Sequence, residues 1–401
     1  MITRQTLIDD LASGCKSKDQ FRVGLEVEQF AYNVKTNQPL AYDGNPGILQ
    51  LLQAFAEAYG WEEITENNKV IALKDSNSNF ITLEPGGQVE YSGAPMKNVH
   101  DAQIAMDTFY TQLHKIAQSL DIGFLAKGFH PSWKLDEIHQ MPKRRAQIMD
   151  AYMERIQSMG KNLMYRACTA QINLDHASEE DMVKNLRLSI AVQPAIVALM
   201  ANSTEAEGKD TGYQSYRSHM WNNTDADRCG ILPFAFEEGM GFARYVDYAL
   251  DVPMYYICRD GDYIDVAGLS FRDFMAGKLQ GFEGEYPTLQ DWREHLSTLF
   301  PEVRLKHYLE LRGADCHTPE MVYAMAAFWT GLFYNETARD AAWDLVKNWT
   351  IEDHQTIRNI VPKQGLNTPT PDGRTLSALA IDVLALLNDD YLEPYKKILA
   401  S

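Results

Sequence analysis

The chain has 401 residues, of which 45% are hydrophobic and 23% charged, and this composition excludes disordered, collagen-like and coiled-coil proteins. Its 37 Lys and Arg against 55 Asp and Glu give a formal net charge of −18, which disfavours nucleic acid and anionic membranes as partners because no long basic run occurs. The longest apolar stretch, residues 190–201, is far shorter than the roughly 20 residues of a membrane span. We therefore expect a folded chain without membrane or nucleic-acid partners.

The N-terminus and the cysteines predict the compartment. Asp9 and Asp10 stand where a secretory signal has its apolar core, so we expect the cytoplasm. The five cysteines are widely scattered and form no C-x-x-C pair, which disfavours both a disulfide framework and a cysteine zinc site. We expect free thiols, and we interpret Cys168 as a small buried residue rather than a nucleophile.

Several helices are predicted in chain order. Asn45-Pro46 and Gly60 flank an apolar-periodic segment over residues 47–59, and residues 98–120 follow the same pattern. Ser178 with Asp181 resembles a capping box at the start of a long apolar helix, which Pro194 is expected to kink. Further helices are predicted over residues 288–300, 319–334 and 376–387. Because no repeat and no linker is present, we expect one catalytic domain over residues 1–401 with a mostly helical C-terminal third.

Four predicted strands each have one polar face. In residues 21–33, Glu26 and Glu28 alternate with Val23, Leu25 and Val27, so both carboxylates lie on the same side. The same alternation gives polar faces to residues 88–93 (Gln88, Glu90), 169–175 (Gln171, Asn173, Asp175) and 308–315 (Glu310, Arg312). Residues 69–75 and 79–86 form a predicted hairpin. The expected fold class is α+β, an antiparallel sheet with helices packed behind it.

The polar faces predict a metal and nucleotide site. A single amphipathic strand is commonly just exposed to solvent, but four neighbouring strands would crowd Glu26, Glu28, Glu90 and Glu310 together, and bound cations would relieve this repulsion. Carboxylate and amide oxygens without a Cys/His cluster suit magnesium or manganese. Neither a Walker A motif nor G-x-G-x-x-G occurs, so phosphates would be bound by metals and arginines. The candidate arginines are Arg144, Arg145, Arg217 and Arg312.

Eight segments in order resemble the plant-type glutamate-cysteine ligases, which also occur in bacteria: VGLEVEQFAY, ITLEPGGQVEYSGAP, MPKRRAQIMDAYM, RACTAQINLD, SYRSHMWNNTDADR, YVDYALDVPMYY, FPEVRLKHYLELRGAD and AAFWTGLFY. The resemblance covers nearly the whole chain and implies a half-barrel antiparallel sheet of the glutamine synthetase-like type. It also implies ATP-dependent joining of the γ-carboxylate of L-glutamate to the amine of L-cysteine through γ-glutamyl phosphate, the first step of glutathione synthesis. The implied cofactors are ATP and magnesium, and we expect a monomer or a homodimer.

The resemblance also implies roles for individual residues. It assigns magnesium binding to Glu26, Glu28, Glu90 and Glu310, with Gln171 completing one metal shell, and contact with the ATP phosphates to Arg312. Arg145 and Arg217 correspond to arginines that contact glutamate and the transferring phosphate, so that the three arginines are the expected catalytic residues. Glu84 and Gln88 would bind the cofactor or stabilise their turn, and Thr169 and Trp221 would line the amino-acid pocket or pack.

The sequence departs from the family pattern at three places. Arg144 replaces the usual glycine of MPKGR, Cys316-His317 replaces a Gly-Gly pair, and NSTEAEGKDTG differs from the usual NSPFTEGKPNG before Arg217. The chain begins at its first predicted helix, so we do not transfer the disulfide switch of the plastid enzymes. Two alternatives remain open: a γ-glutamyl ligase with another amine acceptor, and a non-catalytic relative that binds nucleotide or glutamate.

Overall fold

The computed structural model describes residues 1–400. Its central feature is an antiparallel sheet of nine strands in the order β14-β15-β7-β1-β5-β4-β3-β2, with β6 paired to the far end of β1. The strands are β1 Val23–Asn33, β2 Glu62–Glu66, β3 Lys69–Lys74, β4 Phe80–Leu83, β5 Val89–Ser92, β6 Ile122–Leu125, β7 Thr169–Leu174, β14 Val303–Leu305 and β15 Leu309–Asp315. The predicted antiparallel sheet is confirmed.

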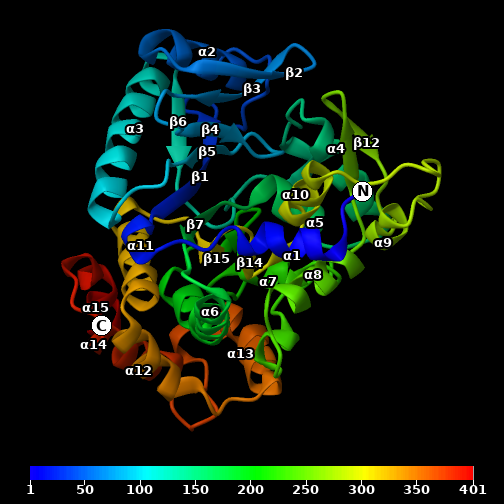
Figure 1. The fold of residues 1–401 in the computed structure, drawn as a ribbon. Helices are drawn as coiled ribbons and strands as arrows, with labels where there is room; N and C mark the ends of the chain where they lie inside the picture. The colour runs from blue at the N-terminus through cyan, green and yellow to red at the C-terminus, as the bar shows by residue number, and fades with distance from the viewer. Residues whose placement is uncertain (401) are drawn as a thin grey trace.

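Fifteen α-helices surround this sheet within the described residues. They are α1 Arg4–Ala12, α2 Ile48–Tyr59, α3 Val99–Ser119, α4 Arg144–Arg155, α5 Gly160–Arg166, α6 Glu179–Leu199, α7 Tyr216–Trp221, α8 Phe242–Asp251, α9 Phe271–Met275, α10 Leu289–Ser297, α11 Pro319–Tyr334, α12 Glu336–Val346, α13 Ile351–Gln364, α14 Leu376–Ala385 and α15 Glu393–Ala400. The predicted helical C-terminal third corresponds to α11–α15 (Figure 1).

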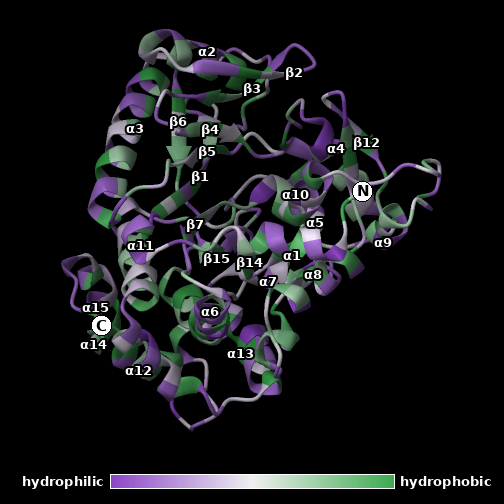
Figure 2. Ribbon diagram, viewed as in Figure 1, coloured by the Kyte–Doolittle hydropathy of each residue, from purple (hydrophilic) through white to green (hydrophobic). Residues whose placement is uncertain are grey.

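The helices divide between the two faces of the sheet. Helices α3, α6 and α11 contact β1, β7 and β15, and bury the apolar residues of those strands, such as Leu25 and Val27 on β1 and Ile172 on β7. Helices α4, α5 and α10 lie on the other side, across from the polar face (Figure 1). Turns of α3 alternate between hydrophilic and hydrophobic colour, as expected of a helix with one buried face (Figure 2). The helices therefore cover the polar face of the sheet but leave a cavity over it.

The capping residues explain where the helices begin. The side chains of Asn98 and Ser178 accept hydrogen bonds from Asp101 N and Asp181 N, the third residue of α3 and of α6. Helix α2 begins at Ile48, after Gly47, and ends at Tyr59, where Gly60 caps it in a left-handed conformation (φ 71°) that suits glycine. Helix α6 continues through Pro194, so the proline does not end it.

One helix has the length and apolar character of a membrane span. Helix α6 passes this test by composition, yet 89% of its most apolar window is buried inside the protein. Its last two turns, from Val192 to Leu199, contain only buried residues because the sheet, α13 and α14 pack around it. These contacts identify α6 as a core helix.

Three two-stranded sheets lie outside the central sheet, in the segments between helices. They are β8 Glu205–Ala206 with β9 Lys209–Asp210, β11 Tyr256–Arg259 with β12 Asp262–Asp265, and the parallel pair β10 Cys229–Gly230 with β13 Phe300–Pro301. All five cysteines are free, as predicted.

Candidate functional site

A cavity of about 310 Å³ lies over the polar face of β15, β7, β1 and β5. The four strands with predicted polar faces are consecutive in the sheet, and this adjacency brings distant parts of the chain into one cavity. Ten of the residues predicted from sequence line it: Glu26, Glu28, Glu84, Glu90, Arg145, Thr169, Gln171, Arg217, Trp221 and Arg312.

The register of the strands explains this convergence. On β1, Glu26 lies opposite Gln171 of β7, and Glu28 lies opposite Glu90 of β5. Directly opposed residues in an antiparallel sheet point to the same side and lie about 5 Å apart. The alternating apolar residues necessarily point to the helical core. The sheet therefore brings three carboxylates and one amide together.

The carboxylates are partly deprived of water. Burial, together with the charges of Glu310 and Glu90, raises the pKa of Glu26 to about 7. Burial and the neighbouring Glu84 and Glu90 raise the pKa of Glu28 well above its usual range, and burial and Glu84 also raise the pKa of Glu90. These shifts mean that the cavity disfavours a full set of negative charges and would favour a cation.

Each carboxylate is held by hydrogen bonds. Asn173 Nδ2 donates to Glu26 at 2.7 Å, and the backbone N–H of Thr169 donates to Glu28 at 2.9 Å. The hydroxyl groups of Thr82 and Ser92 donate to the two oxygens of Glu90 at 2.6 and 2.9 Å. The side chains are therefore ordered by the sheet, and one oxygen of Glu28 has no hydrogen bond to residues 1–400.

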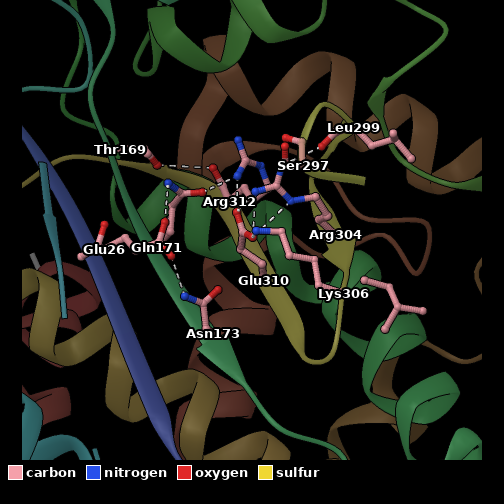
Figure 3. A network of polar contacts seen from close by, with 12 residues as sticks. Glu26, Thr169, Gln171, Asn173, Ser297, Leu299, Arg304, Lys306, Glu310 and Arg312 are labelled. Atoms are coloured by element: carbon pink, nitrogen blue, oxygen red, sulfur yellow. Dashed lines mark hydrogen bonds and ion pairs between the residues drawn. The ribbon is translucent and has the colours of Figure 1, made fainter. Parts of the chain in front are cut away.

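Glu310 lies at the centre of a cationic cluster (Figure 3). Arg304 Nη2 contacts its carboxylate at 2.6 Å, Lys306 Nζ contacts it at 3.1 Å, and Arg312 pairs with it as well. Burial alone would raise the pKa of Glu310, but these three cations hold it well below its usual range. Arg312 also donates to Gln171 Oε1 at 2.6 Å, which connects the cationic cluster to the carboxylates.

Arg217 enters the cavity from α7. It is 2% exposed, and its guanidinium donates to the carbonyl oxygens of Arg312 at 3.0 Å and Gly313 at 3.2 Å. Those carbonyls lie where the register of β15 and β7 shifts between Leu311 and Ala314. The bulge therefore directs two backbone acceptors to Arg217.

Arg145 enters from α4, on the opposite side of the cavity. Its guanidinium makes no hydrogen bond or ion pair with residues 1–400, although Tyr256 and Glu84 raise its pKa electrostatically. The adjacent Arg144 is exposed and lies outside the lining. Arg145 thus offers an unpaired cation to an anionic ligand.

The helical side of the lining is mostly apolar. Met149 and Met153 are one turn apart on α4, Leu163 and Met164 lie on α5, and Trp221 packs near Phe300 with ring centroids 6.0 Å apart. The cavity therefore has a charged wall from the sheet and an apolar wall from the helices, as expected of a site for small polar ligands.

Two predicted site residues do not line the cavity. The Gln88 amide donates to the carbonyl oxygens of Met164 and Ala167 and accepts from Gly86 N, so it holds the Pro-Gly-Gly turn against α5. The prediction that Gln88 binds the cofactor is thus not supported, because no polar atom of its amide is left for a ligand. Glu310 is fully buried and turned to three cations.

Sequence reasoning missed Arg304 and Lys306, which both line the cavity. Arg304 lies on β14 opposite Glu310 of β15, and Lys306 directly follows the last residue of β14. A hairpin reading of VRLKHYLELR would have placed both cations on the polar face. Because the strand was predicted to begin at Tyr308, Arg304 and Lys306 were not identified as site residues.

The donor atoms of the carboxylate and amide side chains suit a hard divalent cation. Their present positions do not surround a common point. Glu26, Glu28, Glu90 and Gln171 offer only oxygens as ligands, the type magnesium prefers. Within residues 1–400, however, no three His, Cys, Asp or Glu side chains are already grouped as a metal site. Magnesium therefore remains a prediction that requires these side chains to turn toward a common point.

Comparison with solved structures indicates the class of the fold. The structure of glutamate–cysteine ligase from Francisella tularensis in complex with AMP matches with a TM-score of 0.54 at 13% sequence identity, covering 94% of this chain and 81% of that one. At this identity the match shows the shared fold only. The shared fold is the one found in that glutamate–cysteine ligase.

Sequence comparison gives the family. The family model Glutamate-cysteine ligase family 2 matches residues 22–390, and the chain belongs to that family. Relatives named glutamate–cysteine ligase, chloroplastic, from Nicotiana tabacum and Arabidopsis thaliana are each 47% identical over 388 residues, covering 97% of this chain and 73% of each relative. The B form from Oryza sativa subsp. japonica is 46% identical and is covered to 77%.

These names correct one prediction. The expected cytoplasmic location is contradicted by the relatives, which are named chloroplastic. The prediction depended on finding no apolar secretory core. Plastid targeting segments are amphipathic and Arg- and Ser-rich, so that criterion could not detect them.

Proposed function

We propose that this chain is an ATP-dependent ligase that joins the γ-carboxylate of L-glutamate to the amine of L-cysteine. The observation that carries the proposal is a single cavity lined by five cations, Arg145, Arg217, Arg304, Lys306 and Arg312, and by the half-buried Glu26 and the buried Glu28 and Glu90. Family membership and the names of the relatives support the same reaction. The AMP bound to the Francisella enzyme supports a nucleotide as a substrate.

The reaction needs negative charge to be stabilised on transferring oxygens. A carboxylate is a poor acyl donor, so the γ-carboxylate first takes the γ-phosphoryl group of ATP, and the cysteine amine then displaces phosphate from the acyl phosphate. Arg312, held by Gln171 and Glu310, contacts the ATP phosphates in this proposal. Fixed cations in a cavity that excludes water are effective because they need no reorganisation during the reaction.

Arg145 and Arg217 hold glutamate and the transferring phosphate. Arg145 has an unpaired guanidinium at the helical wall, and Arg217 has a fixed one at the bulge of β15. A planar guanidinium binds carboxylate or phosphate with two parallel hydrogen bonds, which fixes the direction of the ligand as well as its position. Thr169 and Trp221 complete the amino-acid side of the cavity, and Glu84 lies near the nucleotide.

Glu26, Glu28, Glu90 and Gln171 would hold magnesium. When bound, magnesium neutralises the ATP phosphates and draws charge from the transferring phosphoryl group. Glu310 can join the ligands only if it leaves at least one of its three cations. The raised pKa values of Glu26, Glu28 and Glu90 support a cation that would replace bound protons.

Phosphate release from magnesium-ATP tests the proposal. The purified chain is incubated with L-glutamate and either L-cysteine or a panel of other amines, and the products are identified by mass spectrometry. We expect cysteine-dependent release that yields γ-glutamylcysteine. Turnover only with another amine would contradict the acceptor, and no turnover with any amine would contradict the function.

A further inference from the structure

The segment between α6 and α7 forms a loop with closed ends. An isolated parallel bridge pairs Ser203 with Ser215, and the N–H of Tyr216 donates to the carbonyl of Ser203 at 2.8 Å. The β8–β9 hairpin lies between these two serines. The position at which the chain enters α7 is therefore set at this closure.

Asp315, the last residue of β15, ties both ends of the loop. One carboxylate oxygen accepts from Ser203 Oγ at 2.6 Å and from Asn202 N at 2.9 Å, and the other accepts from Ser215 Oγ at 2.8 Å. The residue is 1% exposed and does not line the cavity. A buried carboxylate with three short donors fixes the groups around it, because each donor would otherwise lose a hydrogen bond away from water.

The same carboxylate provides a counter-charge for Arg217. Arg217 Nη1 lies 4.0 Å from the Asp315 oxygen that accepts from Ser215, and the N–H of Arg217 donates to Ser203 Oγ at 3.2 Å. Both the backbone and the guanidinium of Arg217 are therefore arranged around groups that Asp315 holds. The guanidinium also contacts the two backbone carbonyls of the bulge and lies 6.0 Å from the ring centroid of Trp221.

We propose that Asp315 is a positioning residue of the ligase reaction, which acts by holding Arg217 in the direction that its substrate contact requires. This inference rests on the proposed function. Asp315 touches no ligand in the cavity, so its whole effect on the reaction passes through Arg217. Substituting Asp315 should accordingly change turnover only in a chain that has arginine at position 217.

A double-mutant cycle tests the inference. The steady-state kinetics of γ-glutamylcysteine formation are measured for the parent, Asp315→Asn, Arg217→Lys and the double variant. We expect Asp315→Asn to lower kcat/KM for glutamate by about 10-fold in the parent, the loss of one charge-assisted contact. In the Arg217→Lys background we expect the same substitution to cost about twofold or less.

Equal losses in the two backgrounds would overturn the inference, since they would show a general structural effect. Asp181→Asn is the matched control, because Asp181 forms a 2.6 Å ion pair with Arg339 outside the cavity. The factor by which it lowers kcat/KM should be the same in both backgrounds. If Asp315→Asn lowers the thermal unfolding midpoint strongly, Ser203→Ala replaces it in the cycle, since it removes one donor to Asp315 and the acceptor of the Arg217 N–H. A parent without glutamate-dependent turnover would overturn the proposed function and the inference with it, whereas an active parent with an additive cycle overturns the inference alone.

Discussion

Glu26 shows how a residue of the cavity couples stability to pH. Its pKa is about 7 in the folded chain, against 4.5 for an ordinary glutamate. Between these values the folded state retains a proton that the unfolded state has released, so the unfolding free energy falls as pH rises. We expect the metal-free chain to lose about 2–3 kcal/mol of unfolding free energy between pH 4.5 and pH 7 from this group.

Chemical denaturation over this pH range tests the expectation. Glu26→Gln should make the pH dependence less steep, because an amide does not titrate, whereas Glu28 and Glu90, whose pKa values are also raised, still do. Glu63→Gln is the matched control, since Glu63 is an exposed residue of the edge strand β2 and its substitution should leave the slope unchanged. Parallel pH profiles for the parent and Glu26→Gln would contradict the raised pKa.

Arg145 and Arg144 form a natural pair for substitution. They are adjacent in sequence, but only Arg145 lines the cavity. We expect Arg145→Ala to lower kcat by about 100-fold, the usual loss when one donor to a developing anion is removed. Arg144→Ala should leave kcat within about twofold. Similar kcat values for the two variants would show that Arg145 takes no part in the reaction.

At this scale the sequence predicted most of the cavity. Alternation within each strand separated its polar face from its apolar face, as for Glu26 and Glu28 on β1 and Gln171 on β7. The contacts of Gln88 with the backbone of α5 could not be predicted, because they join segments that are distant in sequence. The pairing of Glu310 with Arg304 likewise depends on a hairpin that was not interpreted as one.

At the scale of elements, the bulge of β15 positions two arginines. It contains Arg312, and its carbonyl oxygens accept hydrogen bonds from Arg217. A Cβ added to Gly313 would lie 1.9 Å from Nε2 of the buried Gln193 on α6. We expect Gly313→Ala to destabilise the chain by about 1–3 kcal/mol through overpacking and to lower activity by displacing the carbonyl that Arg217 contacts.

A second substitution makes this prediction specific. Gln193→Ala removes the clashing amide, so the double variant should recover a large part of the stability lost by Gly313→Ala, as measured by thermal unfolding. Strictly additive losses would show that the bulge depends on the backbone freedom of glycine rather than on space. The sequence could not reveal this contact, since no local pattern connects Gly313 to α6.

The elements themselves were largely predictable. The hairpin of β3 and β4 and the helices α3, α10, α11 and α14 follow from periodicity and capping. The start of α2 was predicted too early, because Asn45-Pro46 resembles an N-terminal signal, whereas the helix begins after Gly47. Strand order was the main unknown, since sequence alone does not say that β15, β7, β1 and β5 are neighbours.

At the scale of the whole molecule, the cavity is formed where the sheet meets α4, α5 and α7. The sheet supplies carboxylates and the cationic cluster, and the helices supply Arg145, Arg217 and the apolar wall. The two sides come from segments between Glu26 and Arg312, so only the complete fold forms the site. This arrangement places a nucleotide and two amino acids against one charged surface in the proposed reaction.

The central claim is that the γ-carboxylate of glutamate attacks the γ-phosphoryl group of ATP before the amide forms. Turnover with L-glutamate labelled with ¹⁸O in both γ-carboxylate oxygens tests this directly, with the released phosphate analysed by mass spectrometry. The account predicts one labelled oxygen in each phosphate and one in the new amide. Amide formation with unlabelled phosphate would contradict it.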